Sequence, residues 1–253
     1  MTFIPGSATV SDAGPEGRLK VACKDCNLFQ LCLPVGLGEA DLALLDRVIK
    51  RRRPLRRGEY LFRPGEPFLF IHAVKSGSFK SYTPLNSGPD QVTGFHLPGE
   101  LLGLDAINAR THSCGARALE TSSVCEVPLD RLEELGSVVA SVQRQMLRIM
   151  STQIRHDREL QVLLCKKTAE QRLAAFLLGF SDRFHRRGFS AREFRLSMSR
   201  RDIGSYLGLA EETVIRVFGR LQAQALIRIE RKHVRIEDLP RLHTLAGTPP
   251  LND

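Results

Sequence analysis

Three cysteines near the start of the chain carry the first sign of chemistry. Cys23, Cys26 and Cys32 form the spacing Cys-x2-Cys-x5-Cys within the segment CKDCNLFQLC. Thiolates are the usual protein ligands of zinc and of iron–sulfur clusters, so this spacing indicates a soft-metal site. A fourth ligand is needed, and the spacing leaves three candidates open: Cys114, Cys125 and Cys165. Cys165 lies in the apolar run VLLC, where a small buried hydrophobe is the simpler role.

The segment that begins at Ser199 carries the second sign, a helix-turn-helix. Ser199 can cap a helix over RRDIGSYLG, and Gly208 can supply the left-handed residue after it. The segment LAEETVIRVFGRLQAQ then predicts a second helix. In this motif the N-terminal residues of the second helix meet base edges in the major groove. The candidate base-reading residues are therefore Glu212, Thr213, Ile215 and Arg216.

Glu212 and Arg216 are four residues apart, so they share one face of the predicted helix. An arginine can donate two hydrogen bonds to guanine, and a glutamate can accept one from cytosine. The same two side chains could instead form an ion pair on a solvated helix. The full pattern around the turn favours DNA reading, and the net charge of +9 agrees with an anionic partner.

The hydrophobic pattern predicts the elements that must position these residues. A short amphipathic helix is expected over 38–53, and short apolar runs between glycines and prolines over 58–128 are typical of a β-roll or jelly-roll. A long helix is expected over 129–164, and its apolar residues have the spacing of a dimerising coiled coil: Leu147, Met150, Ile154 and Leu164. Another helix is expected over 169–185, and the runs LIRIE and HVRIE predict the hairpin of a winged helix-turn-helix.

These expectations divide an α+β chain into five parts. They are a disordered leader (1–20), a cysteine segment with a β-roll sensor domain (21–128), a dimerisation helix (129–165), a winged helix-turn-helix domain (166–240) and a flexible tail (241–253). The sequence has neither a secretory signal nor an apolar run long enough to span a bilayer. We therefore expect a cytoplasmic protein without a membrane partner, and its cysteines should be reduced.

Several long blocks of the sequence resemble one family. CKDCNLFQLC, GFHLPGELLGLDAI, ALETSSVCEVP, KKTAEQRLAAFLLGFSDRF and SMSRRDIGSYLGL resemble the FNR family of the cAMP-receptor-protein (CRP) superfamily, over residues 23 to about 238. The resemblance implies an N-terminal cyclic-nucleotide-binding-like β-roll, a long dimerisation helix and a C-terminal winged helix-turn-helix. It also implies that Cys23, Cys26, Cys32 and Cys125 bind one [4Fe–4S] cluster, with the block ETSSVCEVP selecting Cys125.

The function implied by the resemblance is transcription regulation by oxygen. With its cluster intact, the protein would form a homodimer, bind palindromic double-stranded DNA with TTGAT-like half-sites and recruit RNA polymerase. Asp157 lies beside the apolar seam, and two such carboxylates facing each other would keep the dimer marginal, so that a cluster could decide the equilibrium. The resemblance places a polymerase-contacting surface at four residues: Thr121, Arg187, Phe189 and Ser190.

The chain departs from the family pattern at three places. Ile215 stands where the family usually has serine, and an isoleucine cannot donate a hydrogen bond but can pack on a thymine methyl group. Asn27 and Pro89 also replace the usual residues beside a cysteine and in a surface loop. The superfamily's nucleotide-binding turn, Gly-Glu-Leu, is present at 99–101, but Arg110 lies at the wrong offset for a phosphate. We therefore expect a β-roll that works without a nucleotide.

Three other functions each account for part of the sequence less well than transcription regulation by oxygen. A CRP-type regulator with zinc or no metal, responding to a small molecule, would keep the helix-turn-helix but leave the cysteines without a role. An enzyme is not favoured, because the sequence contains no nucleophile elbow, phosphate loop or HExxH pattern. A membrane-surface protein would account for the positive charge alone.

Overall fold

The computed structural model describes residues 22–247, and its first domain is a β-roll of two four-stranded antiparallel sheets. One sheet has the order β1 (Lys50–Arg51), β8 (Ser123–Pro128), β3 (Phe70–Ser76) and β6 (Leu101–Leu102). The other has the order β2 (Tyr60–Phe62), β7 (Gly115–Ala118), β4 (Phe79–Thr83) and β5 (Gln91–His96). Fully buried side chains from both sheets, such as Phe79 and Val124, fill the space between them.

The outer face of the first sheet is covered by helices and by the cysteine segment. These are the 3₁₀ turns η1 (Cys23–Asp25) and η2 (Phe29–Leu31), helix α1 (Glu39–Val48), helix α2 (Leu129–Val138) and the start of α3 (Ala140–Lys166). The helix predicted over 38–53 ends at Val48, because the next residues pair with β8 as strand β1. A third 3₁₀ turn, η3 (Leu104–Ala106), follows β6.

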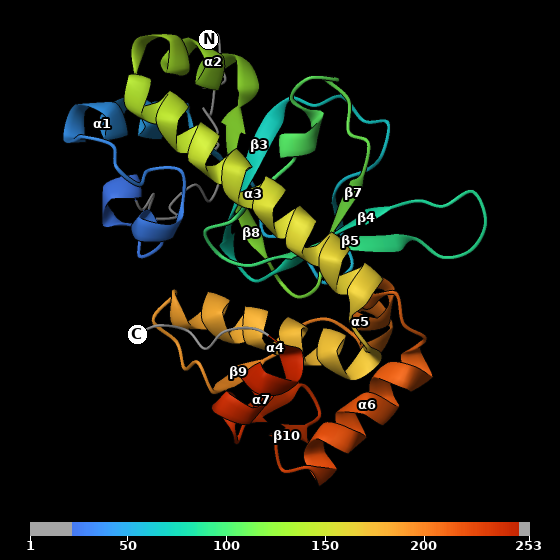
Figure 1. The fold of residues 1–253 in the computed structure, drawn as a ribbon. Helices are drawn as coiled ribbons and strands as arrows, with labels where there is room; N and C mark the ends of the chain where they lie inside the picture. The colour runs from blue at the N-terminus through green and yellow to red at the C-terminus, as the bar shows by residue number, and fades with distance from the viewer. Residues whose placement is uncertain (1–21, 248–253) are drawn as a thin grey trace, which may run out of the picture.

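The single helix predicted over 129–164 is two helices. Val139 has an extended conformation (φ −115°, ψ 91°) and separates α2 from α3. Its side chain is buried together with Val142 in the core under the cysteine segment, so tertiary packing outweighs the helical preference of the surrounding residues. Helix α3 then runs diagonally across the β-roll and ends beside α5 (Figure 1).

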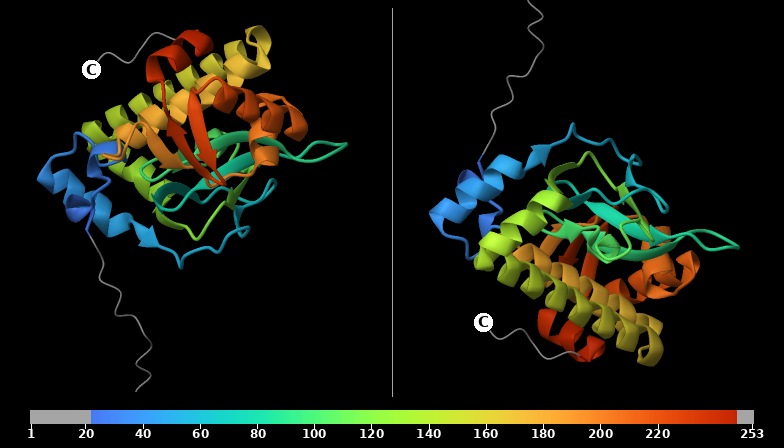
Figure 2. Two further views of the ribbon diagram at one scale, coloured as in Figure 1. Left: turned by 90° about the horizontal axis from the view of Figure 1, so that it is seen from below. Right: turned by 90° about the horizontal axis from the view of Figure 1, so that it is seen from above.

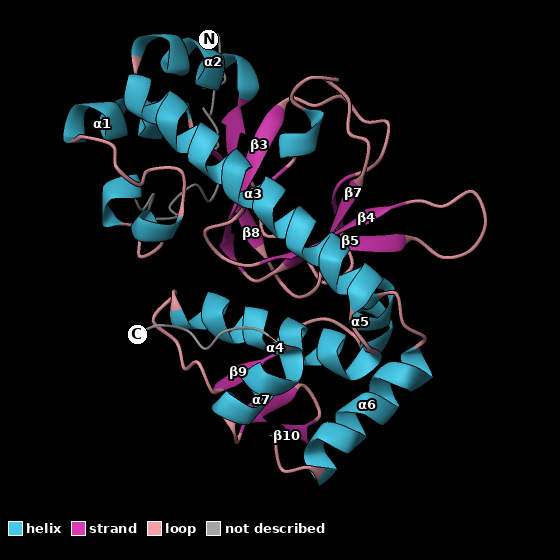
Figure 3. Ribbon diagram, viewed as in Figure 1, coloured by secondary structure: helices cyan, strands magenta, loops and turns pink. Residues whose placement is uncertain are grey.

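The second domain contains the remaining helices and a three-stranded sheet. Its elements are α4 (Ala169–His185), β9 (Glu193–Arg195), α5 (Arg200–Leu207), α6 (Glu211–Ala223), β10 (Ile227–Glu230), β11 (His233–Ile236) and α7 (Leu239–Ala246), and the sheet has the order β10-β11-β9. Figure 3 shows these helices grouped at one end of the molecule and α1 and α2 at the other.

The prediction of a flexible tail from residue 241 is wrong for residues 241–247, which belong to helix α7 and its C-cap. Helix α7 begins at an Asp238 cap, has a proline in its first turn and ends at Gly247, which has the left-handed conformation. Leu242 and Ala246 are fully buried against the other helices of the domain. The predicted leader, 1–20, and the last residues, 248–253, lie outside the described part of the chain.

The two domains pack directly on each other (Figure 2). Phe95 of β5 contacts Phe176 and Phe180 of α4, and the apolar core of the second domain continues into β5. Polar contacts surround this core: Lys80 pairs with Asp202 at 2.5 Å, and Ser78 Oγ donates to Ser197 Oγ at 2.7 Å. The β-roll domain therefore holds the helix-turn-helix domain in a defined position.

Candidate cysteine site and nucleic-acid interface

Four cysteines from two distant parts of the chain line one apolar pocket. Cys23, Cys26 and Cys32 come from the turns η1 and η2, and Cys125 comes from strand β8. Cys125 lies opposite Ala73 in the sheet, and the small alanine leaves room beside the thiol. The rest of the lining is mostly apolar and includes Phe29, Leu33, Ile49, Val74 and Val127. Cys114 and Cys165 are elsewhere: the thiol of Cys114 contacts Asp105, and Cys165 is exposed near the end of α3.

The pocket disfavours free thiolates. Burial raises the pKa of both Cys23 and Cys32 to about 12, and nearby Asp46 adds to the effect on Cys23. Burial also raises the pKa of Cys125, against the opposing influence of Lys75 and Arg51. Burial therefore favours the neutral thiols of Cys23, Cys32 and Cys125, and only a cationic centre could stabilise several thiolates together here.

The arrangement of the four thiols suits a group larger than one ion. Within residues 22–247, no three His, Cys, Asp or Glu side chains lie close enough together to hold a single metal ion. The four cysteines nevertheless face a common pocket, and Cys26, Cys32 and Cys125 each raise the pKa of at least one other cysteine there. Iron–sulfur clusters are held by cysteine thiolates, so four thiols around one apolar pocket fit such a cluster.

The helix-turn-helix is built by local rules. Ser199 and Asp202 form a reciprocal capping box at the start of α5, with both backbone N–H groups bonded at 3.0 Å. Gly208 ends the helix with φ of 63°. A Cβ atom at Gly204 would lie 2.6 Å from the carbonyl oxygen of Leu209, so only glycine allows α5 to approach the turn this closely.

The predicted base-reading residues share the exposed start of α6. Glu212, Ile215 and Arg216 are exposed, while Val214 of the same turn is fully buried and anchors the helix. No ion pair joins Glu212 and Arg216 in the described part of the chain; Arg216 instead approaches Thr213 Oγ1 at 3.5 Å. Both charged groups are therefore free to meet bases, and the exposed fraction of Ile215 is 54%.

The predicted dimerisation residues lie along one exposed stripe of α3. Leu147, Met150 and Ile154 are exposed, and Val162, which the sequence reasoning missed, is also exposed by 57%. Every side chain from Ser151 to Glu159 is exposed. Asp157 accepts a hydrogen bond from Gln153 at 2.8 Å within the same helix. The helix thus presents apolar side chains for which residues 22–247 of the same chain offer no partner.

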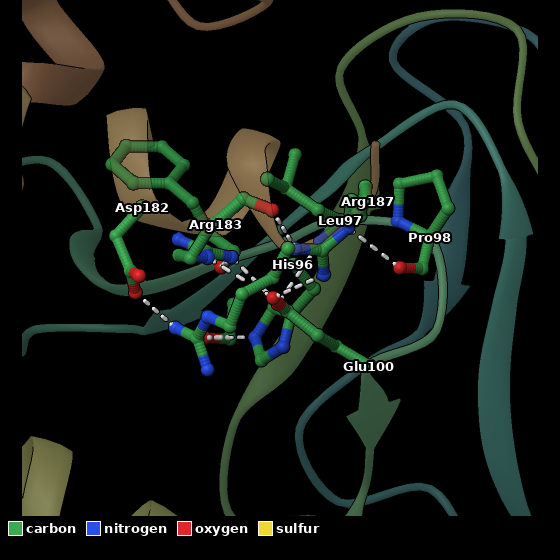
Figure 4. A network of polar contacts seen from close by, with 10 residues as sticks. His96, Leu97, Pro98, Glu100, Asp182, Arg183 and Arg187 are labelled. Atoms are coloured by element: carbon green, nitrogen blue, oxygen red, sulfur yellow. Dashed lines mark hydrogen bonds and ion pairs between the residues drawn. The ribbon is translucent and has the colours of Figure 1, made fainter. Parts of the chain in front are cut away.

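The four residues predicted to contact polymerase are not all on the surface. Thr121 and Ser190 are exposed, and 62% of Phe189 is exposed. The side chain of Arg187 is only 5% exposed and points inward, where it bonds Glu100 and the carbonyl oxygen of Pro98 (Figure 4). This contact could not be predicted from the sequence, because its partners are about ninety positions apart along the chain.

In the structure, the Gly-Glu-Leu turn at 99–101 and Arg110 bind different partners. Arg110 pairs with Glu133 of α2, away from the turn. Glu100 is held by Arg183 of α4 and by Arg187, which follows that helix. Glu100 lies in the turn that the superfamily pattern associates with a nucleotide, and its carboxylate has protein partners here.

Comparison with known proteins agrees with this architecture. Residues 52–137 match the cyclic nucleotide-binding domain, and residues 171–245 match the Crp-like helix-turn-helix domain. Together with the fold, these matches define a regulator of the CRP/FNR type. No helix within the described residues is both long and apolar enough to cross a membrane.

Individual relatives narrow the assignment. The chain is 52% identical to the transcriptional activator protein Anr of Pseudomonas aeruginosa, over 89% of this chain and 92% of the relative. It is 46% identical to the fumarate and nitrate reduction regulatory protein of Yersinia pestis, over 92% and 94%. The crystal structure of FixK2 from Bradyrhizobium japonicum superposes with a TM-score of 0.72 at 33% identity, covering 78% of this chain and 97% of that one. The chain belongs to the FNR family of transcription regulators.

Proposed function

We propose that this protein is an oxygen-responsive transcription regulator controlled by a [4Fe–4S] cluster on Cys23, Cys26, Cys32 and Cys125. The observation that carries the proposal is the meeting of these four thiols around one apolar pocket, with the other two cysteines outside it. The cluster would supply an iron centre that reacts with oxygen. The chain's own part is to exclude water from the thiols and to release their protons when the cluster binds.

Dimerisation through α3 is the second element of the proposal. Helix α3 is exposed on all sides from Ser151 to Glu159, and a partner would cover the apolar side chains of Leu147, Ile154 and Val162 along it. A second copy of α3 provides such a stripe by symmetry. Asp157 would lie beside that seam, where repulsion between the two copies keeps the dimer weak until the cluster favours it.

DNA binding follows from the dimer and from α6. A twofold dimer presents two recognition helices, which suit a palindromic site. Arg216 and Glu212 are free to read a G·C pair, and Ile215 can pack on a thymine methyl group. TTGAT-like half-sites are the expected sequence. Phe189, Thr121 and Ser190 remain exposed for contact with RNA polymerase, whereas Arg187 would first have to leave Glu100.

The test is anaerobic purification with iron and sulfide assays, a visible spectrum and DNA binding before and after air. We expect about four irons per chain and a brown protein that bleaches in air and loses specific DNA binding. Cys125→Ser should lose the cluster, whereas the matched variant Cys114→Ser should keep it. A colourless protein after anaerobic cluster reconstitution, with zinc or no metal, would contradict the proposal and favour a small-molecule regulator.

A further inference from the structure

The turn Pro98-Gly99-Glu100 lies directly behind the cysteine segment. Gly99 has φ of +91°, and a Cβ atom built there would lie 2.8 Å from Cβ of Leu31. Leu31 immediately precedes Cys32. The turn and the cysteine segment are therefore in contact with no space between them, and glycine is the one residue that fits.

The same turn is bonded to a wall of the cysteine pocket. The backbone N–H of Gly99 donates to the carbonyl of Val74 at 2.8 Å, and the N–H of Val74 donates to the carbonyl of Glu100 at 2.9 Å. Val74 lines the pocket, and its neighbour Ala73 pairs with Cys125. A shift of either wall of the pocket would thus displace this turn.

On its other side the turn holds the DNA-binding domain (Figure 4). Glu100 Oε1 accepts from Arg187 Nη2 at 2.6 Å and from Arg183 Nε at 3.0 Å, and Glu100 Oε2 accepts from Arg183 Nη2 at 2.5 Å. The arginines also donate to backbone carbonyls, Arg187 to Pro98 at 2.8 Å and Arg183 to Phe95 at 2.6 Å. Arg183 belongs to α4 and Arg187 follows two residues after its end, so these bonds exist only while α4 is docked.

The electrostatics make this contact a strong one. Burial alone would raise the pKa of Glu100, but Arg183 and Arg187 outweigh it and lower the pKa to about 2. Glu100 is therefore ionised at every physiological pH. The side chains of Arg187, Arg183 and Glu100 are 5%, 19% and 30% exposed. Leaving such charges without a partner costs more than losing a solvated surface pair.

We infer that the Pro98-Gly99-Glu100 turn couples the state of the cysteine pocket to the docking of the DNA-binding domain. The pocket positions Leu31 and Val74, these two residues position the turn, and Glu100 then positions Arg183 of α4 and Arg187, which follows the helix. A filled pocket stabilises the docked arrangement, and an empty or altered one loosens it. This inference rests on the proposed function, since it assigns the cluster a second route to the DNA-binding domain besides the α3 dimer.

The first test compares Glu100→Gln with Asp182→Asn. Glutamine keeps the size of Glu100 and removes its charge, whereas Asp182 pairs with Arg186 on the same helix without reaching the β-roll. Hydrogen exchange of α4 is measured anaerobically in cluster-loaded and cluster-free protein. We expect loading to slow exchange in α4 by roughly tenfold in the parent and in Asp182→Asn, a size within the usual range of coupling between sites. In Glu100→Gln this difference should disappear, with iron content unchanged. A difference that persists in Glu100→Gln would overturn the inference. If Glu100→Gln fails to fold, the same comparison is made with Arg183→Gln.

The second test needs no cluster, so it separates this inference from the proposed function. Gly99→Ala places a methyl group against Leu31 and should speed exchange in α4 of the cluster-free protein, because Glu100 of the same turn holds Arg183 of α4. Adding Leu31→Gly removes the opposing Cβ atom and should restore part of the protection. Unchanged exchange in Gly99→Ala, or no restoration in the double variant, would contradict coupling through this turn even if the protein binds a cluster. A protein that binds no cluster but shows this response would overturn only the proposed function.

Discussion

Leu147→Ala tests whether the exposed stripe of α3 forms the dimer. Leu147 is 60% exposed and lies at the start of the stripe that continues through Ile154. Alanine is a better helix former than leucine, so the helix itself should persist. The variant removes apolar surface that only a partner chain could cover.

The size of the effect follows from the exposed fraction. Leucine to alanine deletes three carbon groups, each worth about 0.8 kcal/mol when buried. Since 60% of Leu147 remains to be covered, the loss is roughly 1.4 kcal/mol for each chain and about 3 kcal/mol for each dimer. A loss of about 3 kcal/mol raises the dimer dissociation constant roughly 150-fold.

Anaerobic sedimentation equilibrium of the cluster-loaded protein measures this constant. Leu85→Ala is the matched control, because Leu85 is 51% exposed but lies in the loop between β4 and β5. The control should change the constant by less than about threefold. If Leu147→Ala behaves like Leu85→Ala, the stripe is not the dimer interface and the assignment of α3 fails.

Three further predictions concern DNA, oxygen and pH. Arg216→Ala should weaken binding to the specific site by about 1–3 kcal/mol in anaerobic anisotropy titrations, with iron content unchanged; undiminished specific binding would reject α6 as the reading helix. Asp157→Ala should give a dimer that persists in air by size-exclusion chromatography, because the repulsion across the seam is gone; a variant as monomeric as its parent would disprove that repulsion. Burial lowers the pKa of His96 from 6.5 to about 4, against the influence of Glu100. Because the unfolded chain then binds the proton more readily, cluster-free protein should lose stability as the pH falls below about 6.5, and urea denaturation of His96→Asn should show a smaller loss.

Much of the fold was predictable because its signals are local. The capping residue Ser199, the left-handed Gly208 and the apolar spacing of α6 predicted the helix-turn-helix correctly. The break at Val139 was not predictable, since it depends on burial under a segment more than a hundred residues earlier. Helix α7 was missed although its signals, Asp238 and Gly247, are present in the sequence.

The residues of the candidate site were likewise predictable only in part. The spacing of Cys23, Cys26 and Cys32 indicated a metal, but only the family resemblance distinguished Cys125 from the other candidates, since strand pairing brings it to the pocket. The inward orientation of the Arg187 side chain was not predictable either. It depends on Glu100, and long-range ion pairs leave no periodic trace in a sequence.

One short segment is placed to control both the dimer and the docked DNA-binding domain. The carbonyl of Cys32 accepts a hydrogen bond from Gln145 of α3 at 3.4 Å, while the preceding Leu31 abuts Gly99 of the turn that holds α4. Gln145 is buried and lies two residues before Leu147 on the same helix. Adjacent residues of the cysteine segment contact two different elements, so under the coupling inferred above one movement of this segment would shift α3 and the turn together. Either contact alone could be weak, but a regulator that needs both a dimer and correctly seated recognition helices responds to their combined free energy. We therefore expect Leu147→Ala and Glu100→Gln to impair DNA binding through separable steps, dimerisation in the first and docking in the second.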